Sequence, residues 1–115
     1  MAEYAFTVPI LPGKTQTLRT YITEMTGPRS RELKASRKRL GMKKELVWLQ
    51  KTPMGDFAVV YWETKDIGKV FEEVMKSQDP FDKWFRDKVL VEVHGMNPNQ
   101  PPPPLNEIIR KPQDL

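Results

Sequence analysis

The chain has 115 residues and carries a formal net charge of +4, and it contains no cysteine. This length suits one domain with a real core and leaves little room for a second. The lack of cysteine excludes a disulfide framework, a thiolate metal site and a cysteine nucleophile. No stretch approaches the roughly 18 apolar residues of a membrane span, and the first residues lack the pattern of a signal peptide. We therefore expect a soluble cytoplasmic protein with no membrane partner.

The basic residues are concentrated in one segment. Residues 28–44 contain eight Lys or Arg and one acidic residue, a net charge of +7, whereas the rest of the chain has eleven basic and fourteen acidic residues. On a helical wheel these charges surround most of the segment, and it has no aromatic residue to stack on bases. We favour a solvated basic helix, which makes nucleic acid a disfavoured partner. Anion or nucleic-acid binding through residues 28–44 by a non-catalytic dimer is the alternative.

The first part of the chain predicts a strand and a broken helix. Large apolar residues alternate with smaller ones over residues 4–11, where Pro9 is expected near the strand's end because proline cannot donate to a ladder. Apolar residues at helical spacing predict a helix over residues 14–26. A second helix should begin at Pro28 and be stopped by Gly41.

The clearest pattern is a β-hairpin over residues 45–63. Two runs rich in β-branched and aromatic residues flank a short loop that contains a proline and a glycine. A register that sets Glu45 opposite Glu63 would place like charges side by side. We therefore predict the register that pairs Lys51 with Asp56.

This register divides the hairpin into two apolar faces, because successive side chains of a strand point in opposite directions. One face carries Leu46, Trp48, Gln50, Phe57, Val59, Tyr61 and Glu63, and the other carries Val47, Leu49, Ala58, Val60 and Trp62 with Glu45 at its end. The second, aliphatic face suits helices packed on it. The first face is too aromatic to stay wet and must be covered by something else.

The second half of the chain predicts two more helices and a final strand. Asp66 is the expected N-cap of one helix, and Asp79 precedes the next. Residues 88–93 have both helical and strand character, so their assignment stays open. Residues 98–104 include five prolines and predict an extended connector. Residues 105–110 are the expected closing strand.

The predicted order is β-α-β-β-α-β with split helices, which is the ferredoxin-like α+β arrangement with an antiparallel sheet. Residues 1–97 form this domain. Residues 98–115 add the connector and the C-terminal strand, which belongs to the same domain or is exchanged in a dimer. The face around Trp48 and Tyr61 then predicts a homodimer whose open faces pack together, as in the dimeric α+β barrel.

The order of elements and four motifs resemble a family of small uncharacterised bacterial proteins. The motifs are Gly13-Lys14, Gly41, Glu45-Leu-Val-Trp-Leu-Gln-Lys-Thr-Pro-Met-Gly-Asp56 and Asp79-Pro-Phe-Asp-Lys-Trp84, within a similarity that covers about residues 4–96. That family is assigned to the dimeric α+β barrel group, which also contains antibiotic-biosynthesis-type monooxygenases. The resemblance implies a cavity between sheet and helices that binds or oxidises an aromatic or polyketide-like molecule without a cofactor.

Four candidate site residues share the aromatic hairpin face. Trp48 and Tyr61 are expected to supply flat apolar walls and Gln50 an amide that orients a ligand. Glu63 is a candidate catalytic base, because burial would raise its pKa toward working pH. The alternative is a dimer core in which these polar groups bond one another. Glu45 is expected at the surface or paired with a neighbouring lysine.

Two further candidates lie outside the hairpin. His94 is the chain's single histidine, so one chain cannot form a two-histidine metal site. We expect His94 to contact the backbone, with a catalytic base in the pocket or a haem ligand as alternatives. Arg37 borders the apolar stripe of the basic helix and could balance an enolate or phenolate. With no phosphate loop in the chain, we expect neither a cofactor nor a metal.

Overall fold

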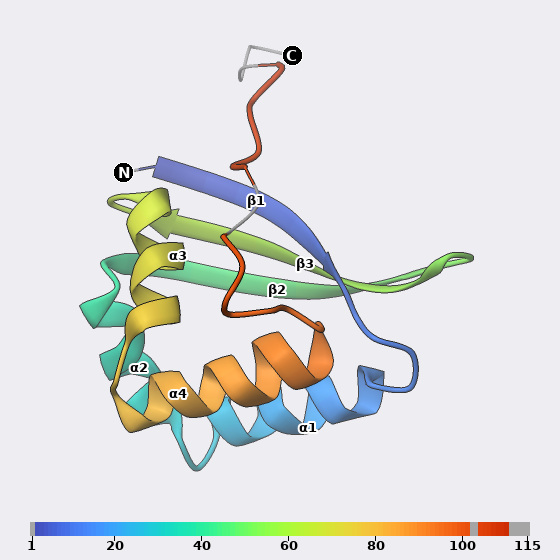
Figure 1. The fold of residues 1–115 in the computed structure, drawn as a ribbon, viewed down its shortest axis with the longest axis horizontal. Coiled ribbons are helices and arrows are strands. Elements are labelled where there is room, and N and C mark those ends of the chain that lie inside the picture. Colours follow the sequence, from blue (N-terminus) through green and yellow to red (C-terminus); the bar gives the residue numbers. More distant parts are fainter. Residues whose placement is uncertain (1, 102–103, 111–115) are drawn as a thin grey trace.

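The computed structural model describes residues 2–101 and 104–110. In chain order the elements are β1 (Ala2–Pro9), α1 (Thr15–Thr26), α2 (Ser30–Arg39), β2 (Met42–Thr52), β3 (Gly55–Thr64), α3 (Ile67–Lys76), α4 (Pro80–Phe85) and the π-helical η1 (Arg86–Val93). The strands form one antiparallel sheet in the order β1-β3-β2, and the helices pack on one side of it (Figure 1). This arrangement confirms the α+β class.

The hairpin has the predicted register. Lys51 lies opposite Asp56, and Glu45 lies opposite Trp62 instead of Glu63. The turn is closed by Thr52, whose hydroxyl donates to the carbonyl of Gly55 at 2.7 Å. The like-charge pair that the other register would create is therefore avoided.

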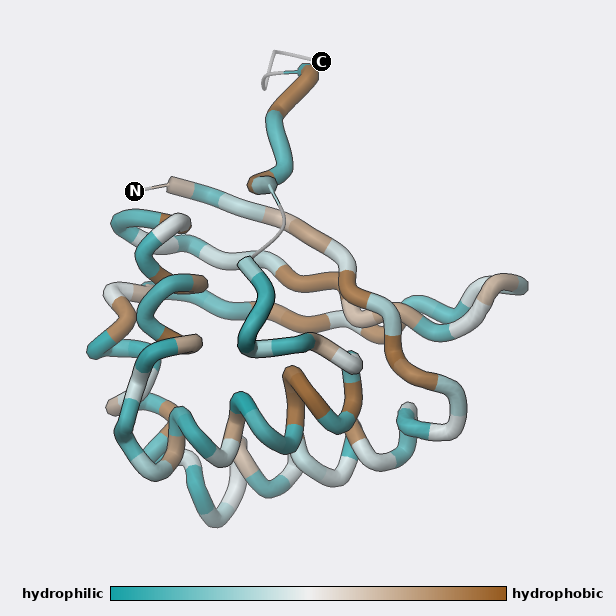
Figure 2. The backbone as a smooth tube through the Cα atoms, in the orientation of Figure 1, coloured by the Kyte–Doolittle hydropathy of each residue, from teal (hydrophilic) through white to brown (hydrophobic). Residues whose placement is uncertain are grey.

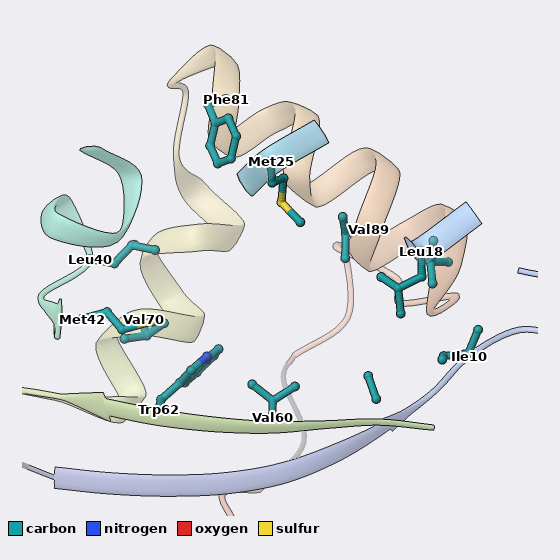
Figure 3. Packing of buried hydrophobic residues seen from close by; sticks show 12 residues of the cluster. Ile10, Leu18, Met25, Leu40, Met42, Val60, Trp62, Val70, Phe81 and Val89 are labelled. Atoms are coloured by element: carbon teal, nitrogen blue, oxygen red, sulfur yellow. The ribbon is translucent and has the colours of Figure 1, made fainter. Parts of the chain in front are cut away.

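The two faces of the sheet have different neighbours. Val60 and Trp62 point from β3 toward the helical layer, and Leu18, Met25 and Val89 point back toward the sheet (Figure 3). Hydrophobic residues gather along the middle of the strands and in η1, whereas α2 is mainly hydrophilic (Figure 2). Helices thus cover the aliphatic face of the hairpin, as predicted.

Local sequence signals correctly predicted most of the helix ends. The Asp66 carboxylate accepts a hydrogen bond from the Lys69 amide at 3.2 Å and caps α3. Gly41, with φ of +74°, ends α2 in a conformation that disfavours other residues. The predicted start of α2 at Pro28 was wrong by two residues. The amide of Ser30 bonds the carbonyl of Gly27, so the intervening residues form a turn.

The ambiguous segment 88–93 is helical. It belongs to η1, a wide-turned continuation of α4 in which the His94 amide donates to the carbonyl of Val89, five residues earlier. Val89 and Val93 are both buried in the core from this helix. A spacing of four residues puts the two side chains on one side in a helix and in a strand alike, so this pair alone could not decide the assignment.

Residues 105–110 do not form the predicted closing strand within this chain, and the alternative in which they are exchanged in a dimer stays a prediction. The backbone amide of Asn106 donates to the Tyr4 hydroxyl at 2.8 Å, and its side-chain amide donates to the carbonyl of Ala5 at 2.9 Å. The Asn106 side chain therefore bonds a backbone carbonyl on the outer edge of β1, and the described residues form no β-ladder there. Within the described residues the sheet has three strands and lacks the last strand of the ferredoxin-like order. Residues 102–103 of the connector and residues 111–115 lie outside the described residues.

Candidate functional site

A cavity of about 590 Å³ lies between the sheet and the helices. Its wall is mostly apolar and includes five aromatic rings, from Tyr4, Phe6, Trp62, Phe71 and Phe85. These side chains come from β1, β3, α3 and α4, so both layers of the fold contribute to it. Pockets for small molecules typically measure roughly 300–1,000 Å³ and are lined in this way.

Four of these rings pack against one another as a single wall. The ring centroids of Phe6 and Trp62 are 4.9 Å apart, and those of Trp62 and Phe71 are also 4.9 Å apart. Tyr4 meets Phe71 edge-on at 6.2 Å. Tilted and edge-on contacts are favourable for aromatic pairs and hold each ring in place. The wall therefore offers flat apolar surface in a fixed orientation.

Few polar side chains line the cavity, and two of them, Arg37 and Glu45, form an ion pair. Arg37 Nε lies 2.9 Å from Glu45 Oε1, and the Trp62 indole N–H donates to Glu45 Oε2 at 3.1 Å. The Arg37 guanidinium also lies 4.5 Å from the centre of the Phe85 ring. The side chains of Arg37 and Glu45 are 12% and 23% exposed. Because the two charges cancel, this end of the cavity favours an uncharged ligand.

A buried hydrogen-bond chain fixes Arg37 in position. Arg37 Nη1 donates to Ser36 Oγ at 3.2 Å, and the Ser36 hydroxyl donates to Asp82. Asp82 also accepts hydrogen bonds from Ser77 and Arg39. Burial by itself raises the pKa of Asp82, but the bonds from Ser36, Ser77 and Arg39 together bring that pKa below its ordinary value. The charged carboxylate thereby ties α2 to α4.

His94 lines another part of the cavity. Its Nδ1 lies 2.8 Å from the carbonyl oxygen of Pro9, as the predicted backbone contact requires. Since a carbonyl can only accept, Nδ1 carries the proton and Nε2 keeps a free lone pair. Burial lowers the pKa of His94, and the bond to Pro9 offsets this in part. A neutral imidazole with Nε2 as an acceptor is the result at neutral pH.

The two polar positions lie far apart along the sheet. His94 contacts Pro9, which pairs with Phe57, while Glu45 pairs with Trp62. Five residues separate these two positions on β3, which corresponds to roughly 17 Å at the rise of a β-strand. An elongated molecule with polar groups at its ends matches this distribution.

The four candidates from the aromatic hairpin face do not line this cavity. Trp48, Gln50, Tyr61 and Glu63 lie on the sheet face that the helices leave open, where Trp48 is 52% exposed. The Tyr61 hydroxyl donates to the Glu3 carboxylate, and this bond raises the pKa of Tyr61 to about 12. The structure therefore separates these residues from Arg37 and His94. Their interpretation as a dimer core stays a prediction.

The place of Glu45 in the cavity could have been predicted from its register in the hairpin, although not from its residue type alone. Its register places it on the aliphatic face beside Trp62, where an unpaired carboxylate would be costly. Such a group needs a cation, and Arg37 borders the apolar stripe of the helix that packs there. The expected pairing of Glu45 with a neighbouring lysine was wrong, because the ion pair is made with Arg37.

In residues 2–101 and 104–110, no group of three or more His, Cys, Asp or Glu side chains is placed to hold a metal ion. None of the helices in the described part of the chain has the length and apolar character needed to cross a membrane. Comparison of the chain with protein-family models, curated proteins and solved structures found no match. The resemblance to the dimeric α+β barrel family therefore stays a prediction.

Proposed function

We propose that the chain binds an uncharged, largely aromatic small molecule in the cavity between its sheet and its helices. The observation that carries this proposal is a cavity of about 590 Å³ with an ordered aromatic wall and mutually cancelled charges. A flat polycyclic or polyketide-like compound suits such a wall, because it buries apolar area on both sides. A charged ligand would have to displace either Arg37 or Glu45 from its partner.

His94 would orient the ligand at one end. Its Nε2 lone pair accepts a hydrogen bond from a hydroxyl group, while Nδ1 is held by the carbonyl of Pro9. Roughly 17 Å away along β3, the Arg37–Glu45 pair offers donors and acceptors to a carbonyl or hydroxyl. Ligands that reach both positions bind more tightly than single-ring compounds in this proposal.

A cofactor-independent oxidation is the catalytic form of the proposal. A neutral His94 beside a ligand hydroxyl can take its proton and return it to water later, as a general base does. The resulting phenolate or enolate can react directly with dioxygen. A ring CH₂ then becomes a carbonyl, a loss of four electrons, while one oxygen atom enters the product and the other leaves as water. Glu63 has no part in this step because it lies on the opposite face of the sheet.

The functional unit in this proposal is a cytoplasmic homodimer with the open sheet faces packed together, which would complete the dimeric α+β barrel. Its support is the exposure of Leu46 and Trp48 on a face that no described segment covers. Ile108 and Ile109 are also exposed, and Ile109 is 91% exposed, so the C-terminal segment offers apolar surface that exchange between subunits would bury. Ferredoxin-like order would then be restored between two chains.

Tryptophan fluorescence tests the ligand site directly. Hydroxylated polycyclic aromatics, such as naphthols and anthrone-type compounds, are titrated against the wild-type chain. Because Trp62 lines the cavity and Trp48 does not, the Trp62→Phe variant should lose most of the ligand-dependent quenching. The Trp48→Phe variant is the matched control and should keep it. Loss of quenching in Trp48→Phe alone, or no quenching by any probe, would refute the cavity as the site.

A filling variant and an activity assay sharpen the test. Ala58 is buried and lines the cavity, so Ala58→Phe should weaken binding by at least about tenfold while the far-ultraviolet circular dichroism spectrum stays native. Val59→Phe, one residue along on the open face, should bind normally.

An oxygen-uptake assay tests the catalytic form of the proposal. Oxygen uptake without added cofactor should fall in His94→Gln but persist in Glu63→Gln. Binding without oxygen uptake would leave the ligand-binding proposal standing and remove the catalytic one.

A further inference from the structure

A second hollow, of about 400 Å³, lies where α2 ends and β2 begins. Four lysines from three parts of the chain line it: Lys34 and Lys38 from α2, Lys43 from β2, and Lys65 just after β3. The Arg37 side chain, which is paired with Glu45, also lines it. No acidic residue is among the described residues that line it. In Figure 1 these segments meet at one end of the sheet. The hollow and the large cavity are neighbours, because Arg37 lines both of them.

The fold brings these lysines together by specific contacts. Lys34 and Lys38 are four residues apart, so they lie on one side of α2. The turn at Gly41 reverses the chain from α2 into β2. The backbone amide of Lys65 then donates to the carbonyl of Gly41 at 3.3 Å, which holds the end of β3 beside that turn. The convergence is therefore a product of the fold and is not a run of neighbours in the sequence.

The four lysines differ in their partners from three of the four arginines of the same basic segment. Arg29, Arg37 and Arg39 each form an ion pair with at least one carboxylate. In the described part of the chain, none of the four lysines of the hollow forms such a pair. Basic residues near the end of α2 complement its helix dipole, but Lys43 and Lys65 lie outside the helix. Four like charges around one hollow repel, and a bound anion would relieve that repulsion.

We infer that this lysine hollow binds a compact anion built of linked phosphate groups. Each lysine ammonium is a point charge with three donors, which suits the oxygen atoms of phosphate. None of the described residues that line the hollow is aromatic, so it offers no ring for base stacking, and its lysines surround one small hollow instead of forming an extended groove. Both features favour a short oligophosphate over a nucleic acid. The phosphate chain is either free or the tail of a nucleotide, and both present the same chemistry to the lysines.

Calorimetric titration with inorganic tripolyphosphate at low salt tests this inference. The wild-type chain should bind saturably, with affinity that falls as salt rises. The Lys38→Gln/Lys65→Gln double variant should bind at least about tenfold more weakly. The control is Lys51→Gln/Lys83→Gln, which removes the same charge from exposed lysines outside the hollow and should change affinity less than about twofold. Amide NMR shifts induced by the ligand should cluster at Gly41 and its neighbours.

Two further probes identify the source of the phosphate. Adenosine triphosphate binding as tightly as tripolyphosphate would assign recognition to the phosphate chain alone, and tighter binding would assign the site to a nucleotide; both outcomes support the inference. No saturable binding at millimolar tripolyphosphate would overturn it, as would equal weakening in both double variants. A short single-stranded DNA that binds more tightly than tripolyphosphate and is weakened equally by Lys44→Gln, outside the hollow, would replace it with a nucleic-acid surface.

Discussion

The two faces of the sheet carry similar side chains but have different surroundings. The covered face presents Phe6 and Trp62, and the open face presents Trp48 and Tyr61. Trp62 is 8% exposed and Trp48 is 52% exposed, although each belongs to the same hairpin. The number of aromatic rings therefore does not determine which face forms a cavity. The position of the cavity is determined by the helices, because they pack on one face of the sheet only.

The carboxylates on the two faces also have different partners. On the covered face Glu45 is held by Arg37 and Trp62 in a partly buried site. On the open face Glu3 accepts a hydrogen bond from Tyr61 at the surface. A carboxylate that has lost water needs a partner of opposite charge, whereas a solvated carboxylate does not. Substitutions matched between the faces can test this contrast.

The largest expected difference is in the contribution of the two tryptophans to stability. Trp62→Ala should lower the free energy of unfolding by about 3–5 kcal/mol, since it removes a large ring from the core and its bond to Glu45. Trp48→Ala should cost no more than roughly 1 kcal/mol in dilute solution, because its ring is already half in water. Urea denaturation followed by circular dichroism measures both. Equal losses would contradict the assignment of the core to one face.

The Arg37–Glu45 pair should give the next largest effect. Glu45→Gln should destabilise the fold by about 2 kcal/mol, less than a fully buried pair would, because both side chains keep some exposure. The double variant Arg37→Met/Glu45→Leu should cost less than the two single changes combined, since neither charge is left alone. Glu63→Gln on the open face should stay within about 0.5 kcal/mol. Additive losses in the double variant would show that the pair is not coupled.

Charge placed on the open face tests the proposed dimer. Trp48→Glu should raise the dimer dissociation constant by at least about tenfold, because association would bury an unpaired carboxylate. Trp48→Phe keeps an apolar ring at the same position and should associate nearly normally. Sedimentation velocity at several concentrations measures both. A wild-type chain that stays monomeric at micromolar concentration would remove the dimer from the proposal.

The smallest effect concerns the pH dependence that His94 contributes. Burial holds the pKa of His94 in the folded state below its ordinary value of 6.5, so the unfolded chain binds the proton more readily. This contribution to stability is fully present above pH 6.5 and is lost as the pH falls toward the folded-state pKa. Each unit of pKa depression corresponds to about 1.4 kcal/mol.

A single histidine makes this prediction easy to measure. Proton NMR should show one imidazole resonance that titrates below pH 6.5 in the folded chain. His94→Gln should lose less stability than the wild type over the same pH range, because glutamine does not titrate there. An imidazole that titrates at or above 6.5 would show that His94 is solvated and not part of the cavity wall.

Prediction from sequence was accurate where contacts are local. The hairpin register followed from the charges of Glu45 and Glu63, and the cap at Asp66 followed from its position before an apolar helical pattern. The segment 88–93 could not be assigned, because its apolar spacing fits both periods. The closing strand predicted at residues 105–110 does not form within this chain, for a different reason. A strand needs a partner edge, and the contacts of Asn106 with β1 are made by a chain that crosses instead of pairing.

The sequence by itself determined an α+β domain, a hairpin with two apolar faces and a basic helix, because alternation, turn residues and charge order act over a few positions. Which of the two faces holds the cavity was decided by tertiary structure. So were the partner of Glu45, the position of His94 beside Pro9 and the meeting of Lys65 with the lysines of α2. Arg37 and Glu45 are only eight residues apart but belong to different elements, and the other contacts join segments far apart in the chain. In both cases the distance between the groups is set by how the helices pack on the sheet.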